Sequence, residues 1–355
     1  MSGPLLSAKE ALARVVALAA PLDIETVPLR EAAGRVLAQP IVATRDQPPF
    51  AASAMDGYAV RAAEVAPGAP LDVIGEVPAG GAWAGALGRG QAIRIFTGAP
   101  MPEGADAVLI QENALREGDR MTPQAAVAPA ENVRPAGVDF RAGARIEAPR
   151  RLGPADIALA ASMNAPFLEV RRKPLVSLIA TGDELVEPGA RPGPSQIVSS
   201  NNYGLAAMLE AAGAAARIEP IARDDAGALT AALDRAENAD LIVTLGGASV
   251  GDHDLVRSVF GAEGLDLAFY KVAIRPGKPL MAGRVRGKAM VGLPGNPVSA
   301  MVLGNLLLRP MVNAFLGLEA APLPRIRARL GSPLKANGPR EHYIRARLEE
   351  TDQGL

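Results

Sequence analysis

Three apolar runs in the second half of the chain constrain the fold most. They cover residues 174–180, Leu241–Leu245 and 290–293, and each is followed by a turn that contains glycine. Strands that are apolar on both faces and alternate with helical segments indicate a parallel sheet with helices on both sides. We therefore predict an α/β/α domain with a mostly parallel sheet over residues 174–323.

The turns after these runs should meet at one edge of the sheet, outside the carboxyl ends of the strands, where open α/β sheets bind ligands. The first two turns carry four carboxylates: Asp183, Glu184, Asp252 and Asp254. In the third turn, Asn296 is a good N-cap residue, Pro297 fits the first helical position, and Ser299 follows in the first turn. The N-terminus of such a helix binds anions. Tight turns without a ligand are the alternative for any one of them.

Three cations, Lys271, Arg275 and Lys278, lie in one short segment that also contains two prolines and a glycine. Guanidinium and ammonium groups hold phosphates and other oxyanions through charge-assisted hydrogen bonds. A solvated basic surface is the alternative, but such a surface needs no restriction of the backbone. We therefore expect an anionic substrate, with Mg²⁺ bridging it to the carboxylates.

The residue types that the chain lacks narrow its chemistry. The sequence has no cysteine and only two histidines, His253 and His342. This excludes thiolate nucleophiles, iron–sulfur clusters and multi-histidine metal sites. Acid–base chemistry then rests on Asp, Glu, Lys or water, and the expected metal is one that prefers oxygen ligands, such as Mg²⁺. The net charge of −1 disfavours a nucleic-acid partner.

The first residues do not resemble a signal peptide, because Lys9, Glu10 and Arg14 interrupt their apolar stretch. No apolar run is long enough to cross a bilayer. We therefore expect a cytoplasmic protein with no membrane partner. Ser7 followed by Glu10 predicts instead a capping box that opens a helix through about Ala20.

The remaining segments predict a β-rich part between two helical ones. Residues 1–44 are expected to be largely helical, and a second helical patch is expected at Pro154–Ser162. Residues 45–139 alternate short strand-like runs with Gly/Pro turns, which predicts a small β domain. The clearest of these runs are Leu71–Val77, 91–96 and 107–111. The tail again has a β-like alternation at 325–330 and 343–348.

Two loops of the β-rich part have an unusual composition. One carries Asp56 before a glycine, and the other carries Thr97 within a stretch rich in proline and glycine. An Asp-Gly pair is more often only a turn, and Pro-rich segments are more often linkers. The residues alone therefore leave two loops in which Asp56 and Thr97 are candidate catalytic residues.

Seven stretches of the sequence occur in a characteristic order from about Val15 to Arg309. They are PPFAASAMDGYAV, RIFTGAPMPEGADAVLIQE, ATGDEL, SSNNYGL, GGASVGDHD, AIRPGKPL and GLPGNPVSAMV. Together they resemble the molybdopterin molybdenumtransferase family, also known as MoeA, whose eukaryotic relative is the E domain of gephyrin.

The resemblance implies a homodimer whose subunits have four domains. One is a discontinuous helical domain from residues 1–44 and 140–173, and another is a β-rich insertion domain at residues 45–139. The α/β/α domain at residues 174–323 would bind molybdopterin. A C-terminal β domain would begin at residues 324–355, where the chain ends with that domain barely begun, so we expect a truncated form of it.

The resemblance also implies the reaction, in which adenylylated molybdopterin and molybdate give molybdenum cofactor and AMP with the help of Mg²⁺. Carried over by motif, the catalytic or metal-organising residues would be Asp56, Thr97, Asp139 and Glu184. The metal ligands would be Asp56, Glu184 and Asp254. Molybdate would be held by Arg275, Lys278 and Ser299. The other substrate-binding residues would be Asp183, Gly246, Gly247, Ser249, Asp254, Lys271, Pro294, Gly295 and Asn296.

One position departs from the family pattern, and one substrate contact is left unassigned by the motifs. Val138 stands where the family usually has an acid, although Asp139 is kept. An oxyanion contact from the C-terminal domain would come from Arg340 or Arg345, and the motifs do not choose between them.

Two other functions fit parts of the pattern. Adenylylation of molybdopterin is carried out by a stand-alone relative of the α/β domain, but that relative lacks the segments around Asp56 and Thr97. A scaffold such as gephyrin shares the fold, but scaffolding normally comes with fused partner domains and linkers, which the sequence does not show. Insertion of molybdate is the function that accounts for all seven stretches.

Overall fold

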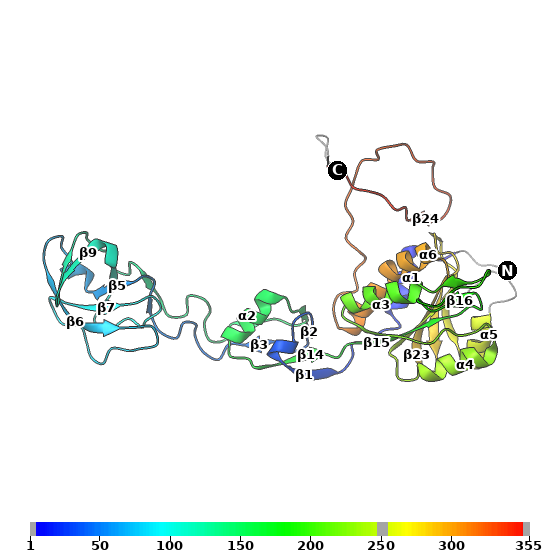
Figure 1. The fold of residues 1–355 in the computed structure, drawn as a ribbon, viewed down its shortest axis with the longest axis horizontal. Coiled ribbons are helices and arrows are strands. Elements are labelled where there is room, and N and C mark those ends of the chain that lie inside the picture. The colour runs from blue at the N-terminus through cyan, green and yellow to red at the C-terminus, as the bar shows by residue number, and fades with distance from the viewer. Residues whose placement is uncertain (1–4, 247–254, 351–355) are drawn as a thin grey trace. The chain divides into compact units, whose positions relative to one another are not determined.

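The structure is a computed structural model that describes residues 5–246 and 255–350 (Figure 1). The chain forms two compact units. The first unit contains residues 1–39, 148–153 and 167–355, and the second contains residues 40–147 and 154–166. Each unit is therefore assembled from segments that are separated in the sequence.

A six-stranded sheet forms the centre of the first unit, in the order β18-β15-β19-β23-β22-β20. Its strands are β15 (Leu175–Ala180), β18 (Ala215–Ile218), β19 (Leu241–Leu245), β20 (Asp266–Tyr270), β22 (Met281–Val285) and β23 (Lys288–Leu293). The first four strands in this order are parallel, and β22 and β20 are antiparallel to their neighbours. The three predicted apolar runs form β15, β19 and β23, which lie side by side as expected.

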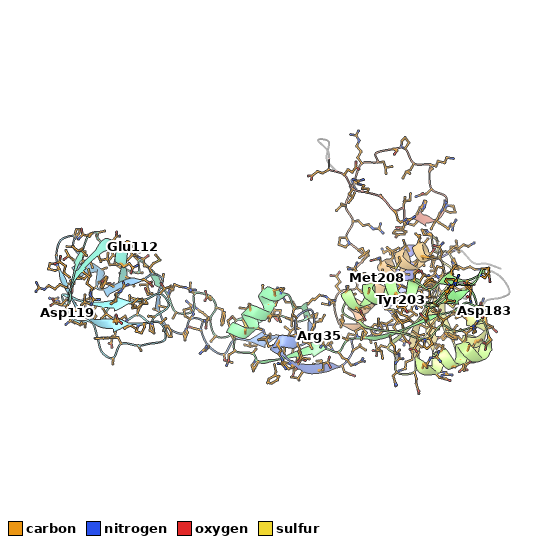
Figure 2. The ribbon with its side chains drawn as sticks, viewed as in Figure 1. Arg35, Glu112, Asp119, Asp183, Tyr203 and Met208 are labelled. Atoms are coloured by element: carbon orange, nitrogen blue, oxygen red, sulfur yellow. The ribbon has the colours of Figure 1, made fainter. Side chains whose placement is uncertain are left out.

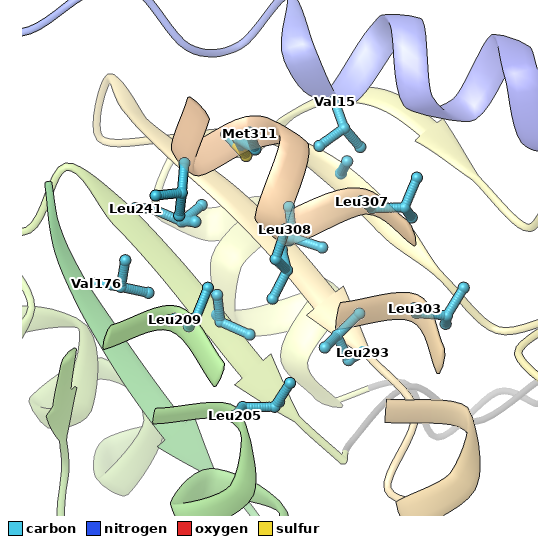
Figure 3. Close-up of a cluster of buried hydrophobic side chains, with 14 of the residues drawn as sticks. Val15, Val176, Leu205, Leu209, Leu241, Leu293, Leu303, Leu307, Leu308 and Met311 are labelled. Atoms are coloured by element: carbon cyan, nitrogen blue, oxygen red, sulfur yellow. The ribbon is translucent and has the colours of Figure 1, made fainter. Parts of the chain in front are cut away.

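Helices cover both faces of this sheet. One face packs against α1 (Ala8–Val16), α3 (Asn201–Ala211), α6 (Pro297–Leu303), the π-helical turn η4 (Gly304–Leu308) and α7 (Arg309–Phe315). The other face packs against α4 (Ala226–Arg235) and α5 (Leu255–Ala262). Val176 of β15 and Leu209 of α3 are both fully buried in the first layer (Figure 3). Burial on both faces explains why these strands are mostly apolar, with Ser177 of β15 and Thr244 of β19 as buried polar residues.

Contrary to the expectation from the sequence, one helical stretch among the described residues, Pro297–Phe315, is long and apolar enough for a membrane span by length and composition. Its side chains Leu303, Leu307 and Met311 are instead buried against the sheet (Figure 3). This stretch is therefore a core helix of the first unit.

The predicted capping box at the start of α1 is confirmed. The Ser7 hydroxyl accepts a hydrogen bond from the Glu10 amide at 3.2 Å, and the Glu10 carboxylate accepts one from the Ser7 amide at 3.0 Å. The helix ends at Val16 rather than near residue 20. Its buried residues Ala11 and Val15 pack into the core of the first unit.

The prediction that residues 1–44 are largely helical is wrong beyond α1. This segment forms the strands β1 (Ile24–Pro28), β2 (Val36–Leu37) and β3 (Ile41–Val42) and the 3-10 turn η1 (Leu29–Glu31). β1 pairs with β14 (Phe167–Arg171) along its whole length, in a four-stranded sheet with the order β1-β14-β2-β13 that includes β13 (Arg150–Arg151). Pairing with a distant strand outweighs local helix propensity here. The segments expected to form a discontinuous helical domain thus contain this sheet, besides the confirmed helix α2 (Pro154–Ser162).

The second unit is built on a six-stranded sheet in the order β8-β5-β7-β6-β10-β9. Its strands are β5 (Gly57–Val60), β6 (Leu71–Val77), β7 (Gln91–Ile95), β8 (Ala107–Ile110), β9 (Ala114–Glu117) and β10 (Arg120–Pro123). The three predicted strands are therefore confirmed as β6, β7 and β8. Shorter elements are β4 (Ala52–Ser53) with β11 (Val133–Arg134), β3 with β12 (Arg145–Ile146), and the 3-10 turns η2 (Ala62–Glu64) and η3 (Gln111–Asn113).

The predicted strands at residues 325–330 and 343–348 are wrong. Between residues 316 and 350, the only strand is β24 (Glu341–His342), which pairs in parallel with β21 (Ile274–Arg275). The sequence alternation alone does not make a strand, because a strand needs a neighbour to complete its backbone hydrogen bonds. The other short ladder of the first unit joins β16 (Leu185–Val186) to β17 (Ile197–Val198).

Candidate functional site

Asp56 and Thr97 are brought together in the second unit by strands β5 and β7. Asp56 directly precedes β5, Thr97 follows the end of β7, and these strands are antiparallel partners. The backbone amide and the hydroxyl of Thr97 both donate to Oδ1 of Asp56, at 2.8 and 2.7 Å. No described residue donates a hydrogen bond to the other carboxylate oxygen, Oδ2. The pair therefore presents an oriented carboxylate with one oxygen ready for a ligand.

The same contacts keep Asp56 ionised. The hydrogen bond from the Thr97 amide lowers the pKa of Asp56 most, followed by the bond from the Thr97 hydroxyl and the nearby positive charge of Arg94. Gly57 must be glycine, because a Cβ there would lie 2.2 Å from the Leu109 carbonyl oxygen of the neighbouring strand. The glycine after Asp56 therefore allows β5, which begins at Gly57, to lie close to the neighbouring strand.

Asp139 lies on another loop of the second unit. Its carboxylate accepts a hydrogen bond from Arg134 at 2.7 Å, and both side chains are about half exposed. Arg134 belongs to β11, which pairs with β4, three residues before Asp56. The described contacts thus tie Asp139 to the strand that leads to Asp56, but they do not join the two carboxylates directly.

In the first unit, the turns after β15, β19 and β23 meet at the carboxyl edge of the sheet. The amide of Gly246, after β19, donates to the Leu293 carbonyl at the end of β23. Gly246 has a positive φ of +98°, and a Cβ there would lie 2.6 Å from the carbonyl oxygen of Thr181, after β15. A Cβ at Gly295 would in turn lie 3.6 Å from the Cα of Gly246. The close approach to Thr181 and the positive φ explain the glycine at position 246, and the contacts confirm the predicted meeting of the turns.

Carboxylates of the first turn lie exposed at this edge. Asp183, which Figure 2 labels, is within 3.7 Å of Arg223, and its carboxylate accepts a hydrogen bond of 3.4 Å from the Asp224 amide. The buried Thr181 hydroxyl donates to the Asp224 carboxylate at 2.8 Å. The Glu184 carboxylate folds back over Gly182, where an added Cβ would meet Glu184 Oε2 at 2.5 Å. Asp224 follows β18 and was missed in the sequence, because no motif marks the end of that strand.

The first turn of α3 connects two of these turns. The side-chain amide of Asn201 donates to the Gly295 carbonyl at 2.8 Å. Tyr203, which lies in the same helical turn and is labelled in Figure 2, donates to the Glu187 carboxylate at 2.9 Å, and this hydrogen bond raises the pKa of Tyr203. Neither residue was singled out in the sequence, although both lie in the SSNNYGL stretch.

The start of α6 has the predicted cap. Asn296 is the N-cap, its Oδ1 accepts a hydrogen bond from the Ser299 amide at 3.1 Å, and Pro297 occupies the first turn. Ser299 is buried, and its hydroxyl lies 3.4 Å from the same Asn296 oxygen. Pro294 is buried, whereas Gly295 is exposed. The capped end of the helix therefore lies in the same turn as Gly295.

The three predicted cations lie on a loop whose backbone closes on itself. The Lys271 amide donates to the Leu280 carbonyl at 2.8 Å, and the Val272 amide donates to the Lys278 carbonyl at 3.2 Å. Arg275 and Lys278 are exposed, while Lys271 is partly buried with its ammonium 5.0 Å from the Tyr270 ring centroid. The loop thus presents two of the three predicted cations as exposed groups from a restrained backbone.

The tail lies beside this loop. The Tyr343 amide donates to the Arg275 carbonyl at 2.8 Å, next to β24. Burial and a hydrogen bond to Glu341 raise the pKa of Tyr343 to about 12. Arg340, which directly precedes β24, is partly buried, and Arg345 is exposed. The choice between these two arginines as an oxyanion contact stays open.

Several predicted residues of the second turn lie outside the described residues: Gly247, Ser249, Asp252 and Asp254. Within residues 5–246 and 255–350, no group of three or more His, Cys, Asp or Glu side chains has the arrangement of a metal site. Mg²⁺ does not require such a group, since it is commonly held by one or two carboxylates together with substrate phosphates and water. Asp56 in the second unit, with Oδ2 free of described hydrogen bonds, and the exposed Glu184 in the first unit each carry carboxylate oxygens, so each by itself fits this ion.

Two family models match the chain. The model for the MoeA N-terminal region (domain I and II) matches residues 6–164, and the model for a probable molybdopterin binding domain matches residues 177–314. Among curated proteins, the chain is 37% identical to the molybdopterin molybdenumtransferase of a Nostoc species over 93% of its own length and 78% of the relative's. It is 39% identical to molybdopterin molybdenumtransferase 2 of Mycobacterium tuberculosis, over 91% of its own length and 83% of the relative's.

A solved structure of a MoeA protein is also similar to this chain. The crystal structure of the molybdopterin biosynthesis MoeA protein from Pyrococcus horikosii superposes with a TM-score of 0.78 at 34% sequence identity, covering 89% of this chain and 81% of that one. The matched segments include the Asp56 and Thr97 loops as well as the three turns of the α/β sheet. The chain therefore belongs to the molybdopterin molybdenumtransferase (MoeA) family, as the seven sequence stretches predicted.

Proposed function

We propose that this chain is a transferase of molybdenum cofactor biosynthesis that inserts molybdate into adenylylated molybdopterin and releases AMP. The observation that carries the proposal is the meeting of three turns at one sheet edge, where Gly246 and Gly295 approach each other beside the capped start of α6. Backbone amides at such an edge favour a phosphorylated ligand. A molybdopterin pyrophosphate is a ligand of this kind.

In this proposal, Asp56, Thr97, Asp139 and Glu184 are the catalytic or metal-organising residues. Thr97 fixes the Asp56 carboxylate through one oxygen and leaves the other for the ligand. The remaining residues of the turns and of the cation loop hold the substrate: Asp183, Gly246, Gly247, Ser249, Asp254, Lys271, Pro294, Gly295 and Asn296. Molybdate, a dianion, is held by Arg275, Lys278 and Ser299. The sulfur ligands of molybdenum belong to the pterin, so a chain without cysteine is suited to the task.

Mg²⁺ is the proposed metal, and Asp56, Glu184 and Asp254 would hold it. When bound, the ion would neutralise negative charge on the phosphates of the substrate. The protein's own contribution is to keep the Asp56 carboxylate ionised, which follows from the hydrogen bonds of Thr97 and the positive charge of Arg94.

Removal of Mg²⁺ tests this part of the proposal. Release of AMP from adenylylated molybdopterin, in the presence of molybdate, should fall to background after chelation and return when Mg²⁺ is added. Equilibrium dialysis of the ion with substrate present provides a second readout. Full activity in a metal-free preparation would remove Mg²⁺ from the proposal.

Lys278→Ala should raise the molybdate concentration needed for half-maximal AMP release, with little change in the affinity for adenylylated molybdopterin. Lys278 is exposed on the cation loop and acts as a point charge toward the oxyanion, whereas the pterin phosphates also meet backbone amides of the turns. Titration of molybdate against the variant measures the effect. Lys9→Ala, which removes an exposed lysine from α1, is the matched control. An unchanged half-saturation in Lys278→Ala would assign this lysine to another role.

A homodimer and a cytoplasmic location belong to the same proposal and rest on the family resemblance. Light scattering of the purified chain tests the first. The scaffold function is the second candidate, and the names of the Nostoc and Mycobacterium tuberculosis relatives, both molybdenumtransferases, favour the enzyme.

A further inference from the structure

Arg94 of the second unit contacts two aromatic rings and donates two hydrogen bonds, although the sequence motifs assign it no role. Arg94 lies on β7 directly opposite Tyr58 of β5, one residue after the Asp56-Gly57 pair. Its guanidinium carbon is 5.2 Å from the ring centroid of Tyr58 and 4.7 Å from that of Phe96. Stacking against two aromatic rings holds the planar group in one orientation.

The guanidinium holds the backbone just after Asp56 and is linked through Gln111 to the Asp56 carbonyl. Nη1 of Arg94 donates to the Gly57 carbonyl at 3.0 Å, and Nη2 donates to the side-chain oxygen of Gln111 at 2.6 Å. The backbone amide of Gln111 in turn donates to the Asp56 carbonyl at 3.1 Å. Two consecutive carbonyl groups, those of Asp56 and Gly57, are therefore held by Arg94 and its partner Gln111.

Within the described part of the chain, the hydrogen-bond partners of the Arg94 guanidinium are the oxygens of Gly57 and Gln111, and none of its contacts is an ion pair. An arginine that serves only to bind a neighbouring carboxylate would show such a pair. Here the group instead binds main-chain and amide oxygens, and its charge contributes the smallest part of the lowered pKa of Asp56. The arrangement is that of a support for Asp56.

We propose that Arg94 is a positioning residue that, together with Gln111, aligns the Asp56–Thr97 pair for the reaction. The proposal rests on the proposed function, since it assumes that Asp56 acts in molybdate insertion. Thr97 orients the Asp56 side chain through Oδ1, and Arg94 orients the backbone from which that side chain extends. Small displacements of a catalytic group are costly in rate, so a support of this kind matters even though it does not touch the substrate.

Arg94→Lys separates positioning from charge. Lysine keeps the positive charge but has no planar fork to reach the Gly57 carbonyl and Gln111 together, and it does not stack in the same way. We expect kcat for AMP release to fall about tenfold or more while KM for adenylylated molybdopterin changes by less than about twofold. Arg116→Lys, at an exposed position on β9 of the same sheet, is the matched control and should leave both constants unchanged.

A second readout does not depend on activity. The amides of Thr97 and Gln111 both donate to atoms of Asp56, so hydrogen exchange at these two amides reports whether Asp56 stays in place. Exchange should become faster at both in Arg94→Lys, and to a smaller extent in the milder variant Gln111→Ala, when measured on the full chain. The amide of Val73, which donates to the Asp119 carbonyl elsewhere in the sheet, should not change.

The outcomes distinguish the positioning role of Arg94 from the catalytic role of Asp56. Faster exchange at Thr97 and Gln111 together with a fall in kcat supports the positioning role. Unchanged exchange in both variants, or faster exchange with kcat at the wild-type value, overturns it. If Asp56→Asn keeps wild-type activity, the proposed function of Asp56 fails, and the exchange data still show whether Arg94 holds this loop.

Discussion

Asp56→Asn should reduce AMP release at least about 100-fold without changing the melting curve. Asparagine has nearly the same shape as aspartate, and its Oδ1 can still accept both hydrogen bonds from Thr97. The substitution therefore removes the negative charge and leaves the geometry. An oxyanion reaction that uses a metal-organising carboxylate loses its charge stabilisation in this variant.

Asp72→Asn is the matched control for this experiment. Asp72 lies on β6 of the same sheet and pairs with Arg120 at 3.5 Å, with both side chains about two-thirds exposed. Exposed ion pairs of this kind contribute little to stability, so both activity and melting should stay at wild-type values. Activity of Asp56→Asn near that of Asp72→Asn would contradict the catalytic assignment of Asp56.

Glu184→Gln should have an effect of similar size, at least about 100-fold on AMP release. Glu184 is exposed, its carboxylate lies over Gly182, and its backbone carbonyl is held by the Ile197 amide at 2.7 Å. Loss of the charge should therefore leave the turn in place. Glu210→Gln, which changes an exposed glutamate of α3, provides the comparison. A folded Glu184→Gln variant with the activity of the Glu210 control would remove Glu184 from the proposed machinery.

The parts of the fold that the sequence predicts are those whose residues carry the signal locally. β15, β19 and β23 are apolar on both faces because helices cover both sides of their sheet. β6 shows the alternation of buried and exposed residues that a half-buried strand requires. The cap of α6 can be predicted from the sequence, because Asn296 and Pro297 are residue types that favour a helix start.

The errors in the fold arise where a distant partner decides the structure. β1 is a strand because β14 pairs with it along its whole length. The residues at and around Ile24–Pro28 carry no sequence pattern that predicts this distant partner. The error in the tail is the opposite one, a predicted strand that does not form. Residues 325–330 alternate as a strand would, but they pair with no strand within the described chain. Strand formation depends on such pairing more than on local propensity.

The candidate site divides in the same way. Asp56 and Thr97 were candidates from their loops, but their direct hydrogen bonds join residues 41 positions apart and required the pairing of β5 with β7. Arg94 and Asp224 were not candidates, because their roles depend on neighbours from other strands: Tyr58 and Gln111 for Arg94, and Thr181 for Asp224. Chemistry that resides in a contact cannot be assigned from one residue.

The dependence of AMP release on molybdate decides whether this chain inserts molybdate. Purified chain is incubated with adenylylated molybdopterin and Mg²⁺, and AMP is measured with and without molybdate. We expect rapid AMP release only when molybdate is present, with conversion of the pterin to molybdenum cofactor in equal amount. An adenylyltransferase would instead form adenylylated molybdopterin from ATP and molybdopterin without molybdate, and a scaffold would release no AMP under either condition. AMP release that is equally fast without molybdate, or absent with it, would contradict the proposed insertion reaction.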